Sequence, residues 1–464
     1  MKQTLRTAAA ACALLAASAS TAGARPSNFQ LAPPASAVHA AEGEVVSNPL
    51  RAPKRFDLVG VRWEGGGEPE IRVRTRRSGG AWSRWTLVPT HADHAPDPRR
   101  GEASGRRFSD PAWVGGADWV QYRSSRRLRG LRLELVSTAG ARLQPTARTA
   151  QNGAPPIVPR TAWGAADCPP RNAPSYGQVR ATFVHHTVST NDYAPEQAPA
   201  MVLAICRYHR YARGWDDVGY NFLVDKYGRI YEGRAGGIDR AVVGAQAQGF
   251  NAQTTGISNI GDHSRLPQSE AAIDAMAALI RWKLPLHGQP TSGRVTLTSA
   301  GGASNRYSAG TPVTLERVPG HRDGNQTACP GDALYAQLPD LRARLGGPPP
   351  VASAPAEPAR LTIVRSKSRV RAGRTIRLAG TIEPPKSTTV YLIAERKTAG
   401  IYRRTAIVPV STREGQARTY FRPLYRALYR FRLSFPGDTE SAAAASPNVY
   451  VRSMRPKRRR QARR

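Results

Sequence analysis

The chain has 464 residues, of which 40% are hydrophobic and 22% charged, and its formal net charge is +35. At roughly 100–200 residues per domain it is too long for one ordinary core, and we expect three domains. The charge is uneven, with +11 in residues 1–150 (23 basic minus 12 acidic), +4 in 151–345 (19 minus 15) and +20 in 346–464 (26 minus 6), so basic flanks suited to polyanions enclose a nearly neutral middle.

Residues 1–24 have the features of a secretory signal. A basic start is followed by a short apolar run from Ala8 to Ala17 and by small residues that suit a cleavage site. Cys12 lies inside the apolar run without a lipobox before it, which argues against a lipid anchor. No later segment is apolar enough to span a membrane. We therefore expect an exported protein without a transmembrane segment.

Residues 25–150 divide into two stretches of different composition. Residues 25–50 are rich in Ala, Pro and Ser and lack periodicity, which predicts a flexible leader. In residues 51–150, apolar and arginine residues alternate through 71–76, and the pattern recurs at 131–135, which is typical of half-buried strands. We expect an N-terminal β-sandwich. Its tryptophans either pack in the core, the commoner fate, or line a carbohydrate platform; they are Trp63, Trp82, Trp85, Trp113 and Trp119.

Residues 155–345 combine the two-residue period of β-strands with the period of amphipathic helices. An apolar strand is expected at 181–187, and an amphipathic helix at 195–211, where Pro195 suits a first turn. A hairpin at 221–232 and a second amphipathic helix near 273–284 follow. The pattern predicts an α/β domain, a mixed sheet with flanking helices, between two β-sandwich-like domains.

The last part of the chain is predicted to be β again. The proline-rich run 346–358 favours an extended, semi-rigid linker. Within residues 359–453, apolar residues alternate with arginines around 429–435, and we expect an immunoglobulin-like domain. The tail 454–464 carries seven basic side chains and is expected to be disordered.

Three cysteines remain after the signal, an odd number for an exported protein. The simplest partition is a disulfide between Cys168 and Cys206, with Cys329 kept as a thiolate by a metal. Spacing alone does not fix this connectivity, and an unpaired, buried Cys329 is the alternative.

His185, His321 and Cys329 are candidate ligands of one zinc ion. Two imidazoles and a thiolate fill three tetrahedral positions and leave the fourth for water, the arrangement of catalytic zinc. The zincin, nucleophile-elbow, Walker and CxxC signatures are missing from the sequence. For any single histidine, a solvated or hydrogen-bonded structural role is the commoner outcome.

Residues of about 158–345 resemble the type-2 N-acetylmuramoyl-L-alanine amidases, a zinc enzyme family that includes the peptidoglycan recognition proteins and phage lysozymes. Four ordered blocks carry the resemblance: Phe-Val-His-His-Thr at 183–187, Gly-Trp-Asp-Asp-Val-Gly-Tyr-Asn-Phe at 214–222, Tyr-Glu-Gly-Arg at 231–234, and Gly-His-Arg-Asp with Thr-Ala-Cys-Pro-Gly-Asp-Ala-Leu at 320–334. The resemblance implies that His185, His321 and Cys329 bind one zinc ion and that Tyr220 is catalytic.

Two positions depart from the family pattern. Thr327, the second candidate catalytic residue, stands where the phage enzymes have lysine and many recognition-protein amidases have threonine. A hydroxyl there can hydrogen-bond the reacting group but supplies no positive charge, so the identity of the proton shuttle stays open. Gln246 stands where many relatives have histidine, and we expect this change to affect the substrate groove. Weaker candidates for that groove are Arg234, Asn251 and Asn221. Three histidines of this segment match no ligand position and are expected to be surface or structural; they are His209, His263 and His287.

The implied activity is hydrolysis of the amide between N-acetylmuramic acid and L-alanine in peptidoglycan, by a secreted monomer associated with the cell wall. The basic flanks are expected to bind anionic wall polymers, and no specific nucleic acid is expected. One rival is a protein that binds peptidoglycan without cleaving it, and the retention of Cys329 and Tyr220 argues against it. The other is a secreted polyanion binder, whose binding would weaken steeply with salt.

Overall fold

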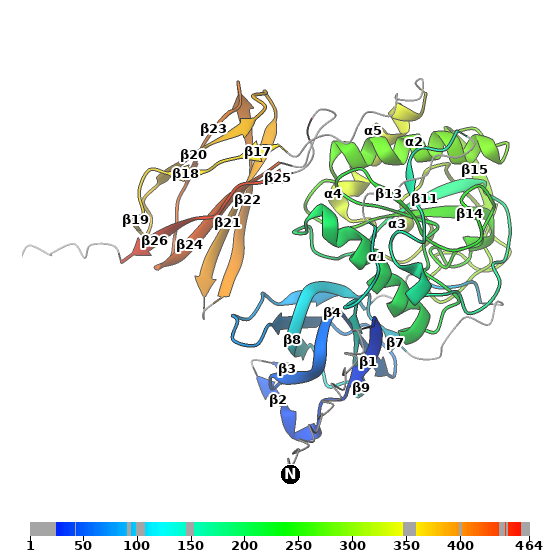
Figure 1. Ribbon diagram of the computed structural model, residues 1–464, viewed down its shortest axis with the longest axis horizontal. Helices are drawn as coiled ribbons and strands as arrows, with labels where there is room; N and C mark the ends of the chain where they lie inside the picture. The colour runs from blue at the N-terminus through cyan, green and yellow to red at the C-terminus, as the bar shows by residue number, and fades with distance from the viewer. Residues whose placement is uncertain are drawn as a thin grey trace, which may run out of the picture.

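The structure is a computed structural model that describes residues 25–41, 43–90, 94–98, 107–144, 153–346, 359–398, 401–435, 441 and 444–455. The predicted signal, most of the predicted linker and most of the basic tail lie outside these residues. The described parts form a mixed α/β domain flanked by two β domains (Figure 1). None of the helices in the described ranges is long and apolar enough to cross a membrane.

The N-terminal domain is built on one sheet in the order β1-β9-β4-β8-β3-β2, with β5 and β7 pairing β8 and β4, and β6 pairing β5. Alternating apolar residues of the long strands face a core that contains Phe56, Val59 and Leu133. The elements are β1 (Ser27–Leu31), the 3-10 turn η1 (Ala35–Ala37), β2 (Val38–Ala41), β3 (Glu44–Ser47), β4 (Leu50–Glu64), β5 (Ile71–Arg76), β6 (Thr86–Val88), β7 (Arg107–Phe108), β8 (Ala112–Ser124) and β9 (Arg129–Ser137).

The predicted flexible leader at 25–50 is wrong, because this stretch supplies three strands. β1 pairs antiparallel with β9, and β3 pairs with both β2 and β8. The Ala-, Pro- and Ser-rich composition hid the strands, since backbone pairing at a sheet edge needs few large apolar side chains. Phe29 and Leu31 provide those few by packing against the core.

The tryptophans of this domain divide into two groups. Trp63 and Trp113 are buried in apolar cores. The others are partly exposed and lie next to arginines: Trp82 and Trp85 have ring centroids 5.0 and 4.7 Å from the Arg74 guanidinium, and Trp119 lies 4.9 Å from that of Arg76. These distances are within the range of cation–π contacts. Core packing therefore accounts for only part of the set.

The central domain has a five-stranded sheet in the order β10-β13-β12-β14-β11. Only β12 and β13 run antiparallel to each other, as the predicted hairpin; the other pairs are parallel. Its strands and turns are β10 (Ile157–Val158), η2 (Ala165–Asp167), β11 (Ala181–His186), η3 (Pro195–Gln197), η4 (Tyr208–Ala212), β12 (Phe222–Val224), β13 (Ile230–Glu232), η5 (Asn251–Gln253), β14 (Thr254–Asn259), β15 (Arg294–Thr298), β16 (Pro312–Glu316) and η6 (Arg344–Gly346). Its helices are α1 (Ala198–Arg207), α2 (Glu270–Leu286), α3 (His321–Gly324), α4 (Asp332–Tyr335) and α5 (Leu338–Ala343).

Helices cover both faces of this sheet, so β11 and β14 are buried along their whole length. This explains why 181–186 reads as a continuous apolar run that ends in two histidines. Helix α2 begins at Ser269, whose hydroxyl accepts a hydrogen bond from the Ala272 amide. Its buried face packs against residues of β12 and α5.

The N-terminal and central domains share one apolar core. Leu58 and Val136 of the N-terminal sheet belong to the same buried cluster as the residues of α1. Next to them, the Tyr208 ring lies directly over Gly60, where a Cβ atom would overlap it. The Tyr208 hydroxyl donates a 2.8 Å hydrogen bond to the carbonyl of Ser109. This buried contact holds the two domains in a fixed relation.

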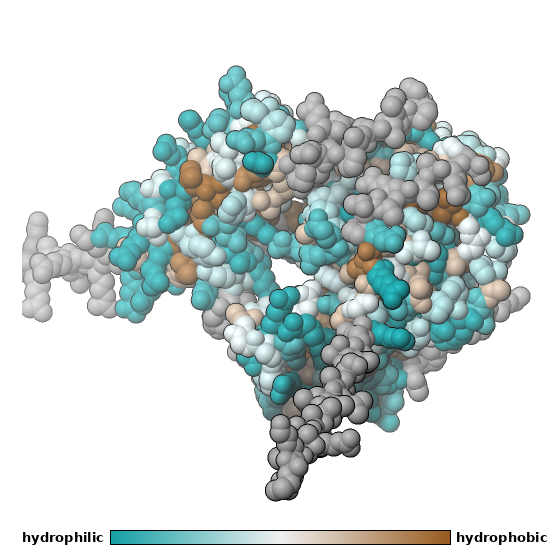
Figure 2. Space-filling view, in the orientation of Figure 1, coloured by the Kyte–Doolittle hydropathy of each residue, from teal (hydrophilic) through white to brown (hydrophobic). Residues whose placement is uncertain are grey.

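The C-terminal strands form one connected sheet in the order β17-β20-β23-β22-β21-β24-β26-β19. β22 pairs with β21 along most of its length and with β23 at its end, so the predicted immunoglobulin-like sandwich is realised as a single curled sheet. The visible face of this domain is largely hydrophilic (Figure 2). The strands are β17 (Arg360–Leu361), β18 (Val364–Arg365), β19 (Arg369–Arg371), β20 (Ile376–Glu383), β21 (Thr389–Thr398), β22 (Ile401–Arg413), β23 (Gln416–Phe421), β24 (Ala427–Phe435), β25 (Ala444–Ala445) and β26 (Val449–Met454).

Candidate metal centre and active site

The three predicted ligands come from separate elements that the backbone ties together. His185 lies near the end of β11, His321 is the first residue of α3, and Cys329 lies in the loop before α4. The Val184 amide donates a 2.9 Å hydrogen bond to the carbonyl of Pro319, and Val184 forms a parallel bridge with Gly320. The start of α3 is thereby fixed beside the end of β11.

The donor atoms of these residues fit a zinc ion. The candidate ligand atoms lie within 4.8 Å of one another, and all three residues are buried. With Zn–N near 2.05 Å and Zn–S near 2.3 Å, a tetrahedral site separates nitrogen from sulfur by about 3.6 Å. The Sγ of Cys329 is 3.8 Å from Nδ1 of His185. Two imidazoles and a thiol are also a donor set that zinc prefers.

Gln246 sets the orientation of His185. The side-chain oxygen of Gln246 lies 2.5 Å from Nε2 of His185, and an amide oxygen can only accept, so Nε2 carries the proton. The Gln246 amide nitrogen in turn donates to Thr254 Oγ1 at 2.9 Å. The Nδ1 lone pair of His185 therefore faces the other candidate ligands. The expected effect of Gln246 on the groove is wrong, because this fully buried side chain positions a metal-site histidine instead.

Two hydrogen bonds position Cys329, one to its sulfur and one from its amide. The amide of His186 lies 3.4 Å from the sulfur and donates toward it, which favours the thiolate. The Cys329 amide donates to the hydroxyl of Thr327 at 2.9 Å. Thr327 therefore shapes the loop that presents the sulfur. His186 points away from the site, as alternation along a strand requires, and its Nδ1 accepts from the His263 amide at 3.1 Å.

Tyr220 lies over the same cluster and is buried. Its ring centroid is 5.6 Å from that of His185. Burial raises the pKa of Tyr220 above its ordinary value, so the hydroxyl stays protonated at neutral pH. A protonated hydroxyl in this position is a hydrogen-bond donor.

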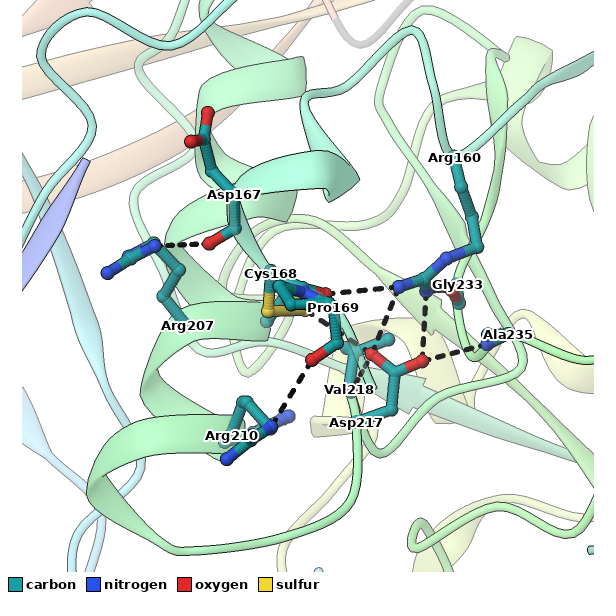
Figure 3. Close-up of a disulfide and its surroundings, with 12 residues drawn as sticks. Arg160, Asp167, Cys168, Pro169, Arg207, Arg210, Asp217, Val218, Gly233 and Ala235 are labelled. Atoms are coloured by element: carbon teal, nitrogen blue, oxygen red, sulfur yellow. Dashed lines mark hydrogen bonds and ion pairs between the residues drawn. A yellow bond between two sulfur atoms is a disulfide. The ribbon is translucent and has the colours of Figure 1, made fainter. Parts of the chain in front are cut away.

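The loop that carries Tyr220 is held by Asp217 and by the disulfide between Cys168 and Cys206 (Figure 3). Asp217 accepts hydrogen bonds from the Val218 and Ala235 amides at 2.8 and 2.9 Å. Arg160 lies 3.1 Å from the same carboxylate. Within the described ranges, the disulfide leaves Cys329 as the free cysteine.

The predicted groove residues separate in the structure. The Asn221 amide group donates to the Val242 carbonyl and accepts from the Gly256 amide, both at 2.8 Å, so Asn221 braces the sheet. It also lines a depression together with Arg234, and its role in a substrate groove stays a prediction. Asn251 is buried and bonds the N-terminal domain. Arg234, also buried, lines a shallow depression with Asp216 and Asp217.

The other histidines of the central domain are structural where they are buried. His209 accepts a 3.1 Å hydrogen bond from the Gly219 amide through Nδ1, and so supports the turn before Tyr220. His263 lies 3.1 Å from the Leu266 carbonyl through its own Nδ1. His287, the C-cap of α2, is only partly buried.

His94 is the functional residue that sequence reasoning missed. It belongs to the N-terminal domain, yet it lies in the same four-residue group as His185, His321 and Cys329. Its Nε2 is 3.3 Å from Nδ1 of His185 and 3.4 Å from the Tyr220 hydroxyl. No motif marks this histidine, and its approach depends on how two domains pack, so nothing local in the sequence identifies it.

Comparison with known proteins agrees with this geometry. Residues 175–332 match the family described as N-acetylmuramoyl-L-alanine amidase, and residues 16–156 match the family described as Rv3811 N-terminal galactose-binding domain-like. Peptidoglycan recognition protein 1 of Bos indicus is 33% identical over 181 residues, which are 39% of this chain and 80% of that protein.

Two further proteins are similar to part of the chain. The N-acetylmuramoyl-L-alanine amidase of Sus scrofa is 31% identical over 222 residues, 46% of this chain, so the chain spans about a third of that relative, 31%. A solved structure of peptidoglycan recognition protein LE in complex with tracheal cytotoxin, a monomeric diaminopimelic acid-type peptidoglycan, has 25% identity and a TM-score of 0.31 and covers 40% of this chain and 92% of that one. Its residues 16–156 are similar to the Rv3811 N-terminal domain family, and the chain belongs to the N-acetylmuramoyl-L-alanine amidase and peptidoglycan recognition protein family.

Proposed function

We propose that this protein is a zinc-dependent amidase that hydrolyses the bond between N-acetylmuramic acid and L-alanine in peptidoglycan. The observation that carries the proposal is the convergence of His185, His321 and Cys329 beneath the Tyr220 ring. The amidases and recognition proteins among its relatives support the same substrate.

Each residue has a chemical role in this proposal. A zinc ion at the site would polarise the amide carbonyl and activate a water molecule near neutral pH. Gln246 holds His185 in the tautomer that presents Nδ1. The His186 amide stabilises Cys329 as a thiolate. Tyr220, kept protonated by burial, donates to the oxyanion that develops on the substrate carbonyl.

We extend the proposal to location and attachment. The signal-like residues 1–24 support export, and the charges of +11 and +20 in the flanking segments support retention on anionic wall polymers. Chemistry and attachment would then belong to different parts of a monomeric chain.

The test is digestion of purified peptidoglycan followed by mass spectrometry of the products. We expect new free amino groups on L-alanine and intact glycan strands, and we expect Cys329→Ala to abolish their release together with bound zinc. Products of sugar-bond or crosslink cleavage would refute the assignment, as would full release by Cys329→Ala.

Recognition without hydrolysis is the competing function, because several relatives are named recognition proteins. A pure binder needs no metal ligands under a protonated tyrosine. It would retain peptidoglycan without releasing amino groups, and the same digestion separates the two functions.

A further inference from the structure

A short segment of the N-terminal domain, His94–Asp97, lies inside the candidate metal centre of the central domain. The Nε2 atom of His94 is 3.3 Å from Nδ1 of His185, and the His94 and His321 ring centroids are 4.5 Å apart. One candidate ligand atom from each of these three histidines and the sulfur of Cys329 all lie within 4.8 Å of one another. The segment therefore places a fourth residue that can bind zinc at the position that the other three ligands would leave open.

Two of the six separations among these four atoms are close to the edges of a coordination tetrahedron. Two nitrogens bound tetrahedrally to one zinc lie about 3.3 Å apart, and nitrogen and sulfur about 3.6 Å apart. His94 to His185 measures 3.3 Å, and His185 to Cys329 measures 3.8 Å. Four protein ligands are the pattern of a closed zinc site, which has no position for water or substrate.

The residues after His94 accept hydrogen bonds from the central domain beside the candidate metal centre. The Asn251 amide nitrogen donates to the Ala95 carbonyl at 2.9 Å and to Asp97 Oδ1 at 2.8 Å. The Gly249 amide also donates to Asp97 Oδ1, at 2.7 Å, and Gln248 donates to the Pro96 carbonyl at 3.1 Å. These four hydrogen bonds fix residues 95–97 against the central domain beside the candidate metal centre.

A buried ion pair anchors the segment at its base. Arg213 donates 3.0 Å hydrogen bonds to the carbonyls of His94 and Ser109 and to Asp110 Oδ1. The other Asp110 oxygen lies 3.7 Å from Nδ1 of His94. Both members of this pair are almost fully buried. The segment is therefore held at the domain interface by a buried network of hydrogen bonds and one ion pair.

Solvent exposure shows that this arrangement excludes substrate. His185 and His321 are 0% exposed, His94 2%, Cys329 3% and Tyr220 4%. A glycopeptide cannot reach groups that are covered to this extent. Because the reacting groups are sealed, a closing role for His94 agrees with the structure better than a role as proton shuttle, which requires substrate beside it.

We propose that the N-terminal domain closes the zinc site: His94 takes the fourth coordination position, the segment His94–Asp97 fills the groove, and the described conformation is a latent amidase. Activity then requires displacement of this segment. The inference rests on the proposed function, since it requires zinc at this site.

The test compares four variants of the full chain with wild type after loading with Co²⁺. In His94→Ala, azide should enter the vacated position and shift the visible d–d bands, whereas wild type should not respond. His39→Ala removes an exposed histidine from the same domain and is the matched control. Asp97→Ala should also admit azide, because it removes the acceptor of two hydrogen bonds while leaving every ligand in place. Asp97→Asn keeps an acceptor oxygen and should behave as wild type.

The zinc forms of the same proteins provide the second readout. Release of L-alanine amino groups from peptidoglycan should rise about tenfold or more in His94→Ala, because apparent activity scales with the fraction of open sites. Equal azide responses in wild type and His94→Ala would overturn the inference. Loss of hydrolysis in His94→Ala with azide already bound by wild type would overturn it in favour of a proton shuttle.

The failure of the proposed function has a different signature. The amidase assignment fails if neither wild type nor His94→Ala binds metal. It also fails if both bind zinc and azide enters His94→Ala, but neither protein releases amino groups. If both release amino groups equally, the assignment stands and only the closure by His94 is refuted.

Discussion

The side-chain oxygen of Gln246 accepts a 2.5 Å hydrogen bond from Nε2 of His185, and this contact decides which ring nitrogen faces the metal site. A metal-ligating histidine is held in one tautomer and one orientation by such a partner, and its loss typically weakens metal binding 10- to 100-fold. The predicted groove residue is thus part of the metal centre.

Gln246→Ala should weaken zinc binding by roughly 10- to 100-fold, because His185 loses the acceptor that fixes its tautomer. Competition with a chromophoric chelator measures the affinity. The matched control is Gln253→Ala, which removes a partly exposed glutamine that donates a hydrogen bond to the carbonyl of Thr298 at the end of β15. An unchanged affinity in Gln246→Ala would show that packing alone orients His185.

Tyr220→Phe should lower kcat by about 10²- to 10³-fold, the usual cost of removing one oxyanion donor. KM and zinc content should stay close to wild type, because the ring and the three predicted ligands remain. Steady-state kinetics on a soluble muropeptide, in the His94→Ala background, measures the effect with the site open. A change confined to KM would place the hydroxyl in substrate binding instead.

Gly60→Ala should destabilise the interface between the first two domains by about 1–3 kcal/mol, because the new methyl group overlaps the buried Tyr208 ring. The free energy of unfolding by urea measures the loss. Gly66→Ala is the matched control, since a Cβ there meets only open space. If the inference about His94 is correct, Gly60→Ala should also admit azide to the cobalt-loaded site.

Lys283 should make stability depend on pH in the alkaline range. Burial lowers the pKa of Lys283 from 10.5 to about 8, and its ammonium bonds the Ile238 and Arg240 carbonyls at 2.6 and 2.8 Å. The pKa of Lys283 is lower in the folded state than in the unfolded state. The free energy of unfolding is therefore highest above about pH 10.5, where Lys283 is neutral in both states, and falls as the pH is lowered to about 8.

Relative to Lys283→Met, the free energy of unfolding of wild type should therefore rise between pH 8 and pH 10.5, by an amount on the order of 3 kcal/mol. Urea unfolding of both proteins across this range measures the difference. A constant difference between the two would contradict the depressed pKa.

Much of the central domain could be predicted from local pattern. The helices at 198–207 and 270–286 and the hairpin at 222–232 follow from amphipathic periodicity and turn residues, which act within a few positions of the chain. The strands within residues 25–50 could not be predicted in this way, because they form only by pairing with β8 and β9. Edge strands depend on a partner's backbone more than on their own side chains.

The sequence by itself determined which residue types can hold zinc, since the four blocks name His185, His321, Cys329 and Tyr220 and their chemistry is local. Only the tertiary structure decided that Gln246 orients His185 and that His94 of another domain lies 3.3 Å from it. The physical reason is distance along the chain: Gln246 and His185 are 61 residues apart and His94 and His185 are 91 apart, so both contacts depend on tertiary packing that no local pattern encodes.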